Sequence, residues 1–366
     1  MIVPYPIVPA DEGGRRRAVS LIKHLAAEHA IVLLTPRSSA YAASDLPATI
    51  YQTTAPGRRH QILSPGFLRR ASAIIRDERP DVILIEYAWS GLHGALLARR
   101  FGLPLVLDAP NVEGDRFRST GARYWRAIAA YEACVTRVAA QVFVVSEEDR
   151  ARFIAKGVRG TKLQLVPNGV DPESMHPDVA AGTAVRRELG IADGTRMHLF
   201  FGQLDYAPNR DALEVISREL LPRLDAAGGA YEIVVAGKGN VDRLRTMHRH
   251  PRLRFAGAVP SIAPYINAAD DVLVPISSGG GTRLKILEAI ACGTPVVSTS
   301  VGAEGIDRGV CGDLLAIADE WDAFVARLTG DRAVKSDRNV PGGFLDMYSW
   351  ANIVRRIDWQ AATKRQ

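Results

Sequence analysis

Residues 279–288 bring glycines, cations and a carboxylate together in an order that suits a phosphorylated ligand. Three glycines follow a buried strand, and Thr282 is expected to open a helix that continues to Cys292. Glycines let the backbone approach a bulky anion, and a helix start presents unpaired N–H groups with partial positive charge. Arg283 and Lys285 add formal charge at the same end. This pattern predicts a phosphate site.

Glu288 extends that site toward a sugar. It lies two turns after Gly281, so both residues share one face of the expected helix. A carboxylate there can accept hydrogen bonds from two hydroxyls of a ribose attached to the phosphate. The alternative is a tight strand-to-helix turn with surface cations and a solvated glutamate. Three glycines, Gly280 and Gly281 among them, and two cations at one helix start favour the ligand site.

Two further glycine-containing turns are candidates for binding part of a phosphorylated ligand. DEGGRRR at 11–17 places Gly14 just before an expected helix from about 15 to 30, where backbone amides can approach a phosphate. Three consecutive arginines are more typical of a solvated face than of a site. Only Arg15, close to the glycines, is kept as a candidate.

The other turn, Gly237, Lys238 and Gly239, follows an expected strand. It resembles the start of a dinucleotide fingerprint, but the third glycine position is Asp242, so a nicotinamide dehydrogenase is not supported.

Polar side chains also follow two expected strands of the first half. In wound sheets, the carboxyl ends of strands are where ligands bind. The candidates are Glu86, Asp108, Asn111 and Glu113. Each taken alone is explained as well by a capping or loop role, whereas together they predict a polar wall.

Short β-branched runs alternate with helical stretches along most of the chain, which predicts an α/β fold with parallel sheets covered by helices. The expected strands are 31–35, 82–87, 105–108, 141–145, 163–166, 198–202, 232–236, 254–256, 272–274 and 295–298. A short opening strand precedes the first glycine loop. Ser146, with Asp149 three residues later, marks a helix start.

The chain is expected to form two domains. A stretch rich in Pro, Gly, Asp and Asn from 167 to about 192 predicts a boundary. We expect a first domain over 1–170, joined by a terminal helix within 346–366, and a second domain over 171–345. Two wound domains in tandem usually bind a ligand between them, outside the carboxyl ends of their strands.

Composition excludes several classes of protein. With 366 residues, 47% hydrophobic, the chain can bury one or two cores. Lys+Arg 46 against Asp+Glu 40 gives +6, which suits an anionic ligand or an acidic membrane surface without requiring nucleic acid. Three separated cysteines support neither a disulfide framework nor a zinc site. No apolar run reaches the ~20 residues of a membrane span, so a cytoplasmic protein is expected.

The motifs resemble those of the family 4 glycosyltransferases, retaining enzymes of the GT-B fold, in the branch associated with bacterial exopolysaccharide and other surface glycans. The resemblance covers nearly the whole chain. It rests on GGGTRLKILEAIACGTPVVST, GAEGI at 302–306, VSEED at 145–149, VPNGVD at 166–171, GKG at 237–239 and YSWANIVRRI near the end. It implies two Rossmann-like domains, the first on the acceptor side and the second binding the donor.

In such enzymes, the resemblance implies, Glu288 holds the donor ribose and the backbone of 281–283 holds phosphate or the donor sugar. Gly237–Gly239 would lie near the nucleotide base. The donor would be a nucleoside diphosphate sugar of the UDP or GDP type, and the acceptor a glycan or a lipid-linked molecule. Arg283 and Lys285, with the helix start, would neutralise the leaving group, so no metal and no cofactor are expected.

The sequence also departs from the family pattern. Gly280 stands where a second glutamate is common, and Pro110 replaces a common histidine before Asn111. An Arg and Lys pair after the first strand of the second domain is absent, and Asp205, Asn209 and Arg210 stand there instead. A nucleotide-sugar epimerase of the same fold and a non-catalytic sugar-nucleotide-binding protein therefore remain as alternatives.

Overall fold

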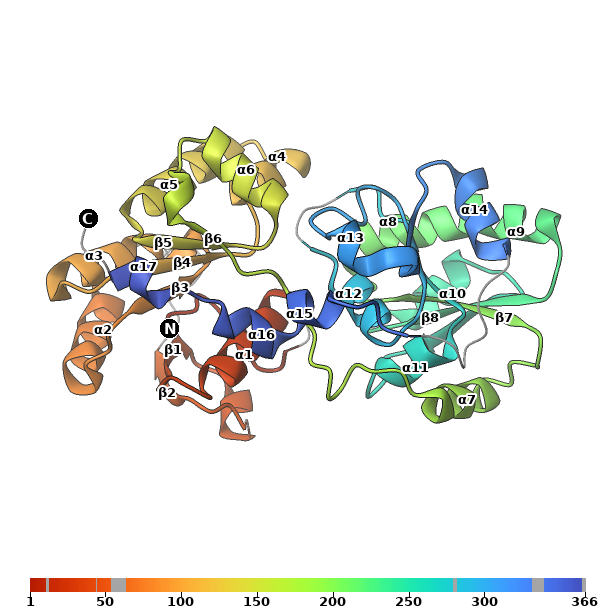
Figure 1. The fold of residues 1–366 in the computed structure, drawn as a ribbon, viewed down its shortest axis with the longest axis horizontal. Helices are drawn as coiled ribbons and strands as arrows, with labels where there is room; N and C mark the ends of the chain where they lie inside the picture. The colour runs from red at the N-terminus through yellow and green to blue at the C-terminus, as the bar shows by residue number, and fades with distance from the viewer. Residues whose placement is uncertain (11–12, 44, 54–63, 279–281, 331–338, 364–366) are drawn as a thin grey trace. The chain divides into compact units, whose positions relative to one another are not determined.

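The computed structural model describes the chain except residues 11–12, 44, 54–63, 279–281, 331–338 and 364–366 (Figure 1). The chain divides into two compact units. Unit 1 contains Met1–Asn168 and Trp350–Gln366, and unit 2 contains Gly169–Ser349. The sequence had placed these boundaries at 170/171 and 345/346. Gly280 and Gly281, both predicted site residues, lie outside the described residues.

Unit 1 is built on parallel strands in two paired groups. The strands are β1 (Val32–Pro36), β2 (Thr49–Thr53), β3 (Ile83–Glu86), β4 (Leu105–Ala109), β5 (Gln141–Val144) and β6 (Leu163–Leu165). β2 pairs with β1, and β3 to β6 pair in chain order. The expected opening strand is reduced to Ile2, which bridges Leu34 of β1 and Ile85 of β3. Strand order therefore reverses at Ile2, which makes its neighbourhood a topological switch point.

Helices surround this sheet. They are α1 (Gly13–Leu25), α2 (Pro65–Glu78), α3 (Gly91–Phe101), α4 (Glu113–Ser119), α5 (Trp125–Val138), α6 (Glu147–Ala155), α16 (Trp350–Arg355) and α17 (Trp359–Thr363). The Ser146 hydroxyl accepts a hydrogen bond from Asp149 N at 3.1 Å, which caps α6 as the sequence predicts. Helix α1 begins at Gly13 and ends at Leu25, so the glycines form its first turn instead of preceding it.

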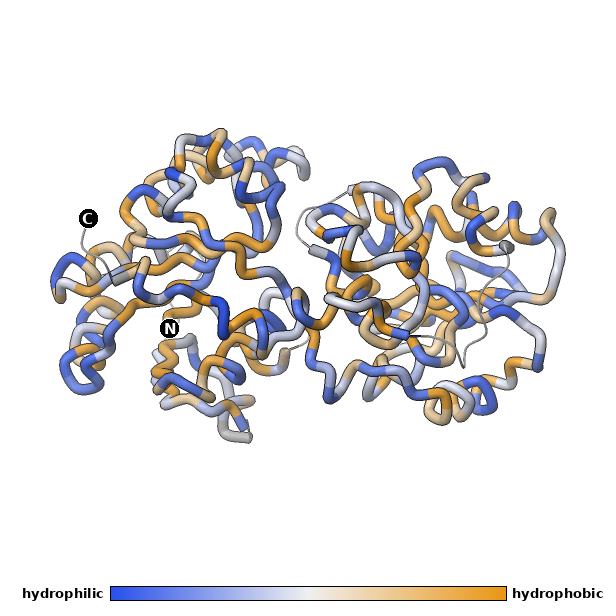
Figure 2. The backbone as a smooth tube through the Cα atoms, in the orientation of Figure 1, coloured by the Kyte–Doolittle hydropathy of each residue, from blue (hydrophilic) through white to orange (hydrophobic). Residues whose placement is uncertain are grey.

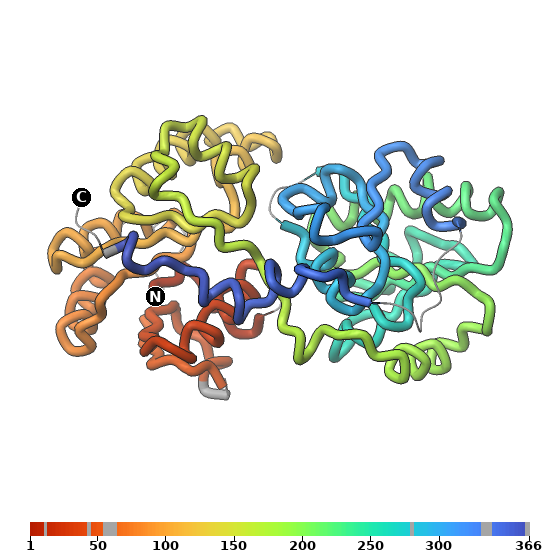
Figure 3. The backbone as a smooth tube through the Cα atoms, viewed as in Figure 1, coloured from red at the N-terminus to blue at the C-terminus, as the bar shows by residue number. Residues whose placement is uncertain are grey.

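The C-terminal segment returns to unit 1, as the blue end of the tube beside α1 shows (Figure 3). Trp350 and Ile353 share a core with Leu21 of α1. The expected single helix from about 348 to 361 is divided among α15 (Phe344–Tyr348), α16 and α17. It breaks after Tyr348 because Ser349 is extended (ψ 130°) and bridges Val170.

Unit 2 contains a six-stranded parallel sheet in the order β12-β11-β10-β7-β8-β9. Its strands are β7 (Arg196–Phe201), β8 (Tyr231–Ala236), β9 (Leu253–Gly257), β10 (Asp271–Val274), β11 (Val296–Ser298) and β12 (Leu315–Ile317). The sequence missed β12, as it missed β2 of unit 1. The order reverses between β7 and β10, so the switch point of unit 2 lies at their carboxyl ends.

The helices of unit 2 cover both faces of this sheet. They are α7 (Val179–Glu188), α8 (Ala207–Val215), α9 (Leu221–Ala227), α10 (Val241–Met247), α11 (Ala263–Ala268), α12 (Leu284–Ala291), α13 (Arg308–Cys311), α14 (Trp321–Thr329) and α15. Figure 2 shows the central strands of each unit mainly in hydrophobic colours. In β7, five consecutive residues from Met197 to Phe201 are buried. Such unbroken apolar strands are typical of parallel sheets covered on both faces.

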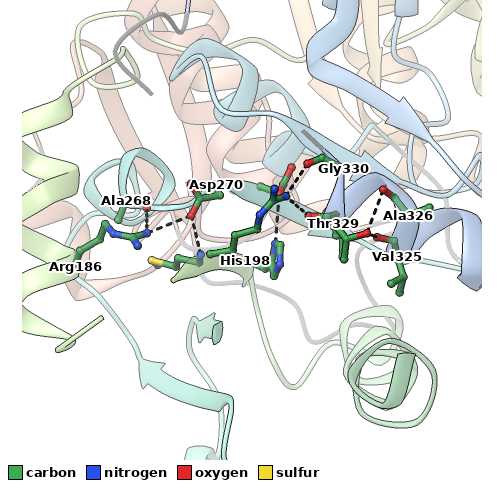
Figure 4. Close-up of polar contacts among 12 residues, drawn as sticks. Arg186, His198, Ala268, Asp270, Val325, Ala326, Thr329 and Gly330 are labelled. Carbon is green, nitrogen blue, oxygen red and sulfur yellow. Dashed lines mark hydrogen bonds and ion pairs between the residues drawn. The ribbon is translucent and has the colours of Figure 1, made fainter. Parts of the chain in front are cut away.

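Polar contacts fix the amino edge of the unit 2 sheet (Figure 4). Arg186 of α7 donates to Ala268 O at 3.2 Å and to Asp270 Oδ2 at 3.3 Å, and Asp270 also accepts from Met197 N at 2.7 Å. His198 and Asp271, paired in register on β7 and β10, are both buried, with Nδ1 and Oδ2 3.3 Å apart. These contacts hold β7 and β10 together at the end opposite their switch point.

One buried cation organises the carboxyl edge of unit 1. Arg17 of α1 is 1% exposed and donates from Nη2 and Nε to the two oxygens of Asp108, at 2.6 and 2.8 Å. Its remaining N–H groups reach Val166 O, Pro167 O and Asn168 Oδ1 at 2.9 to 3.1 Å. Arg17 therefore ties α1 to the ends of β4 and β6. The sequence favoured a solvent-exposed run of arginines, and this prediction is wrong for Arg17, which is buried.

We expect Asp108→Ala to lower the free energy of unfolding of unit 1 by about 3–5 kcal/mol, because it leaves the Arg17 charge buried without a counter-ion. Urea denaturation measures this loss. Asp115→Ala, which breaks the half-exposed ion pair with Lys156, is the matched control and should cost about 1 kcal/mol or less. A loss of similar size in both variants would show that the buried Arg17 charge does not need Asp108 as its counter-ion.

Candidate functional site

The carboxyl edge of the unit 2 sheet holds the residues predicted to bind phosphate. Helix α12 begins at Leu284, so the expected start at Thr282 is wrong by two residues. Arg283 is the N-cap residue and has an extended backbone (φ −80°, ψ 97°), which keeps Thr282 outside the helix. The first turn of α12 nevertheless begins directly after Arg283 and contains Lys285, so both cations lie at its positive end.

Both cations of this helix start are largely removed from water. Arg283 donates from Nη2 to Ser278 O at 3.2 Å, and burial lowers its pKa. Lys285 Nζ lies 3.0 Å from Asn209 Oδ1 and 4.6 Å from the centre of the Phe200 ring. Burial, with the nearby Arg283 charge, lowers the pKa of Lys285 to about 7, against an opposing effect of Glu288. A bound anion would relieve this crowding of positive charge.

Glu288 lies one turn after Lys285 on α12 and is 7% exposed. It is therefore a carboxylate held within the protein, close along the helix to both cations, and not a solvated glutamate. Its role toward a ribose stays a prediction.

Close packing requires glycine in the turn after β8, whether or not a ligand binds there. Gly237 has φ 146°, and a Cβ at this position would lie 1.8 Å from Gly202 O at the end of β7. The Lys238 carbonyl accepts from Leu204 N at 2.7 Å, so the two loops pack backbone to backbone. A side chain on Gly237 would separate the ends of β7 and β8. Whether Lys238 and Gly239 contact a nucleotide stays a prediction.

Close packing also joins the β7 loop to α12. A Cβ on Gly202 would lie 3.0 Å from Asn209 Nδ2 and 3.5 Å from Lys285 Nζ. Asn209, on α8, is thus the partner of the predicted phosphate lysine, a role that the sequence did not reveal. The structure therefore gathers Gly202, Asn209, Lys285 and Gly237 at the switch point of unit 2.

In unit 1, Glu86 lies at the end of β3 beside the switch point and is fully buried. Its Oε1 accepts a hydrogen bond from the Tyr5 hydroxyl at 2.7 Å, and its Oε2 is buried without a hydrogen-bond partner in the described part of unit 1. Burial raises the pKa of Glu86 to about 8, with the neighbouring Asp108 charge adding to the effect. Burial therefore favours the protonated form of Glu86 near neutral pH.

Two tyrosines missed by the sequence analysis complete this cluster. A Cβ on Gly14 would lie 2.8 Å from the Tyr87 hydroxyl and 3.0 Å from the Tyr5 hydroxyl, so both hydroxyls sit against the first turn of α1. Tyr87 has φ 56°, a strained conformation for a residue other than glycine. Nothing in the spacing of Tyr5 or Tyr87 indicates this convergence, because residues distant in sequence meet only across the sheet.

The other polar candidates of unit 1 have partners within the protein. Asp108 is fully engaged by Arg17, so its expected role as a substrate contact is replaced by a structural one. Glu113 is 2% exposed, pairs with Arg116 and accepts from Asn111 Nδ2 at 3.3 Å. Arg15 donates to Pro9 O at 3.5 Å. These side chains are largely bonded within the protein, and a polar wall that faces an acceptor stays a prediction.

Metal-ligand clusters and membrane-spanning helices are both absent from the described residues. No three His, Cys, Asp or Glu side chains come together there as a set of metal ligands. None of the helices in that part of the chain has the length and hydrophobicity needed to cross a bilayer.

Comparison with protein families finds matches over most of the chain. Residues 12–169 match the model described as "Glycosyl transferase 4-like domain", and residues 195–330 match "Glycosyl transferases group 1". The two matched segments lie on either side of the boundary between the two units.

Known proteins agree with these matches. The chain is 31% identical over 316 residues to a D-inositol 3-phosphate glycosyltransferase of Xylanimonas cellulosilytica, covering 74% of this chain and 72% of that protein. It is 26% identical over 307 residues to the UDP-Gal:alpha-D-GlcNAc-diphosphoundecaprenol alpha-1,3-galactosyltransferase of Escherichia coli, covering 78% and 75%. The structure of sucrose-phosphate synthase from Thermosynechococcus elongatus has a TM-score of 0.73 at 17% identity, over 99% and 95% of the chains.

We expect Glu86→Gln to change how stability depends on pH. The pKa of Glu86 is about 8 in the fold, against 4.5 as the ordinary value, so the wild-type protein takes up a proton at this site on folding. Its free energy of unfolding should fall as pH rises from about 4.5 to about 8, by up to about 1.4 kcal/mol per pH unit, and level off above. Glutamine should remove this contribution.

Glu132→Gln is the matched comparison. Glu132 is also buried, and it accepts hydrogen bonds from Glu113 N and Gly114 N, but burial raises its pKa only to about 7. Urea denaturation at pH 5, 6, 7, 8 and 9 should show that Glu86→Gln flattens the curve between pH 7 and 8, whereas Glu132→Gln flattens it mainly below pH 7. An unchanged slope between 7 and 8 in Glu86→Gln would contradict a neutral Glu86.

Proposed function

The chain belongs to the family 4 glycosyltransferases of the GT-B fold, and from this we propose that it moves a sugar from a nucleoside diphosphate to an acceptor hydroxyl with retention of anomeric configuration. The observation that carries the proposal is the pair of cations, the partly exposed Arg283 and the buried Lys285, at the start of α12 on the switch-point edge of unit 2. Such a positive site suits a diphosphate. The epimerase alternative is set aside, because both family models describe glycosyl transferases.

In the proposed reaction, the diphosphate of the donor binds at the first turn of α12. Arg283, Lys285 and the helix N–H groups stabilise the negative charge that grows on the leaving oxygen. Glu288 accepts hydrogen bonds from the ribose hydroxyls of the donor.

The bond between the anomeric carbon and the diphosphate oxygen breaks while the acceptor oxygen bonds to the same carbon, on the same face. The acceptor proton passes to the departing diphosphate oxygen. The chain therefore needs no protein base, which agrees with proline at position 110.

We propose a UDP- or GDP-sugar as donor and a glycan or lipid-linked acceptor. The name of the Escherichia coli relative contains both UDP-Gal and a diphosphoundecaprenol acceptor, which supports this choice. In unit 1, Gly14 is proposed to approach the donor phosphate with its backbone. Arg15 and Glu86 are proposed acceptor-side residues, and Glu86 Oε2 has no hydrogen-bond partner among the described residues. A lipid-linked acceptor would place the protein at the cytoplasmic face of a membrane.

A thermal-shift screen without metal against UDP, GDP, dTDP, ADP and their sugar conjugates tests the donor site. We expect a UDP or GDP compound to stabilise the protein, by about 2.7 kcal/mol at 100 times its Kd. Glu288→Ala and Arg283→Ala should each remove most of the shift, because they remove contacts to ribose and phosphate.

Glu320→Ala is the matched control, since Glu320 is an exposed glutamate at the start of α14 in the same unit. It should keep the full shift. Equal shifts in Glu288→Ala and Glu320→Ala would contradict the donor site, and a shift with a nicotinamide alone would contradict the function.

We also expect sugar transfer from the donor that the screen selects to proceed at the same rate with excess EDTA, because helix N–H groups and two cations replace a divalent ion at the diphosphate. The rate is measured as release of the nucleoside diphosphate in the presence of acceptor. Loss of activity in EDTA, restored by Mg²⁺ or Mn²⁺, would contradict metal-independent transfer.

A further inference from the structure

Lys285 has an unusual set of contacts for a lysine. Its amine is buried and makes one hydrogen bond in the described part of unit 2, to Asn209 Oδ1 at 3.0 Å. Protonated lysine offers three N–H donors, and two of these have no acceptor here. Asn209 is held in place because its Nδ2 donates to Gln203 O at 2.8 Å, which turns Oδ1 toward the lysine.

The charges acting on Lys285 come from its own helix segment. Arg283 lowers the pKa of Lys285, and Glu288 raises it. Three neighbours of the amine in the described part of unit 2 are uncharged: β7 contributes the Phe200 ring and is followed by Gly202, and α8 contributes the Asn209 amide. The ring face at 4.6 Å favours a cation, but burial outweighs it and leaves the pKa at about 7.

We propose that Lys285 is largely a neutral amine in the ligand-free protein above neutral pH, and that binding of a sugar-nucleotide diphosphate is coupled to uptake of one proton by this amine. The inference deepens the proposed function and rests on it. Asn209 is the positioning residue, because its amide oxygen accepts an N–H of the amine without adding charge. The proton comes from the buffer, and the diphosphate supplies negative charge and hydrogen-bond acceptors to the amine.

The coupling has a definite sign. The bound protein holds more protons at this site than the free protein, so affinity must fall as pH rises above about 7. With a free-state pKa of about 7, the amine of Lys285 is mainly neutral at pH 8 and mainly protonated at pH 6. Proton uptake per bound ligand should thus be larger at pH 8 than at pH 6.

Isothermal titration calorimetry measures this uptake directly. UDP-galactose is the first probe, and GDP-mannose replaces it if the thermal-shift screen selects guanine. Neither carries a group that titrates between pH 6 and 8. Each titration is run in two buffers of different ionisation enthalpy, because the difference in observed heat gives the number of protons exchanged.

Variants then assign the proton to Lys285. Lys285→Arg keeps a permanent cation, so whatever its affinity, the binding that it retains should take up no proton at pH 8. Asn209→Asp places a carboxylate beside the amine and charges it before the ligand arrives, so uptake should also disappear and affinity should fall at least tenfold.

Lys162→Arg is the matched control. Lys162, in unit 1, donates to Arg137 O and Ala139 O, and burial lowers its pKa as well. This variant should keep both binding and uptake. Thermal unfolding of each variant without ligand checks that it is folded.

The outcomes separate this inference from the function on which it rests. Binding with no proton uptake at pH 8, or uptake that survives in a folded Lys285→Arg, would overturn the role of Lys285 while leaving the donor site intact. If neither sugar nucleotide binds, the proposed donor site fails as well. Proton uptake that is larger at pH 8 than at pH 6, and that is lost in both Lys285→Arg and Asn209→Asp, would support the coupling.

Discussion

A charge removed from water must be compensated, and this constraint shapes the functional edge of each unit. In unit 1, the Arg17 guanidinium finds a carboxylate, two carbonyls in successive residues and an amide oxygen, so all its N–H groups are used. The network spans α1 and the ends of β4 and β6. It therefore fixes the positions from which α1 presents its first turn to Tyr5, Tyr87 and Glu86.

Unit 2 meets the same constraint differently. Lys285 is also buried, at 9% exposed against 1% for Arg17, but its hydrogen-bond partner in the described part of unit 2 is an uncharged amide. Arginine cannot give up its proton in a protein, whereas lysine can, so the two residues suit opposite purposes. A permanently charged side chain with every donor satisfied stabilises a fold. A lysine whose amine donates to an uncharged amide suits an anionic ligand.

Much of the architecture was predictable from local sequence. Alternation of apolar runs with helical stretches gave the two wound parallel sheets, and Ser146 marked the start of α6. The weak elements were missed or misplaced. Strand β2 is mostly not buried, β12 has three residues, and α12 starts two residues later than expected because Arg283 is extended. Arg283, Lys285 and Glu288 could be chosen from the sequence as candidate donor-site residues because they lie within six residues on one segment.

By itself, the sequence determined the fold class, the family and the candidate phosphate-binding segment, since these depend on periodicity and on residues close together in the chain. Tertiary structure alone decided which polar residues are partners. Arg17 and Asp108 are 91 positions apart, Tyr5 and Glu86 are 81, and Asn209 and Lys285 are 76. Sheet order brings these pairs together, and burial then sets their charge, so neither the partners nor the protonation state can be read from residue type or spacing.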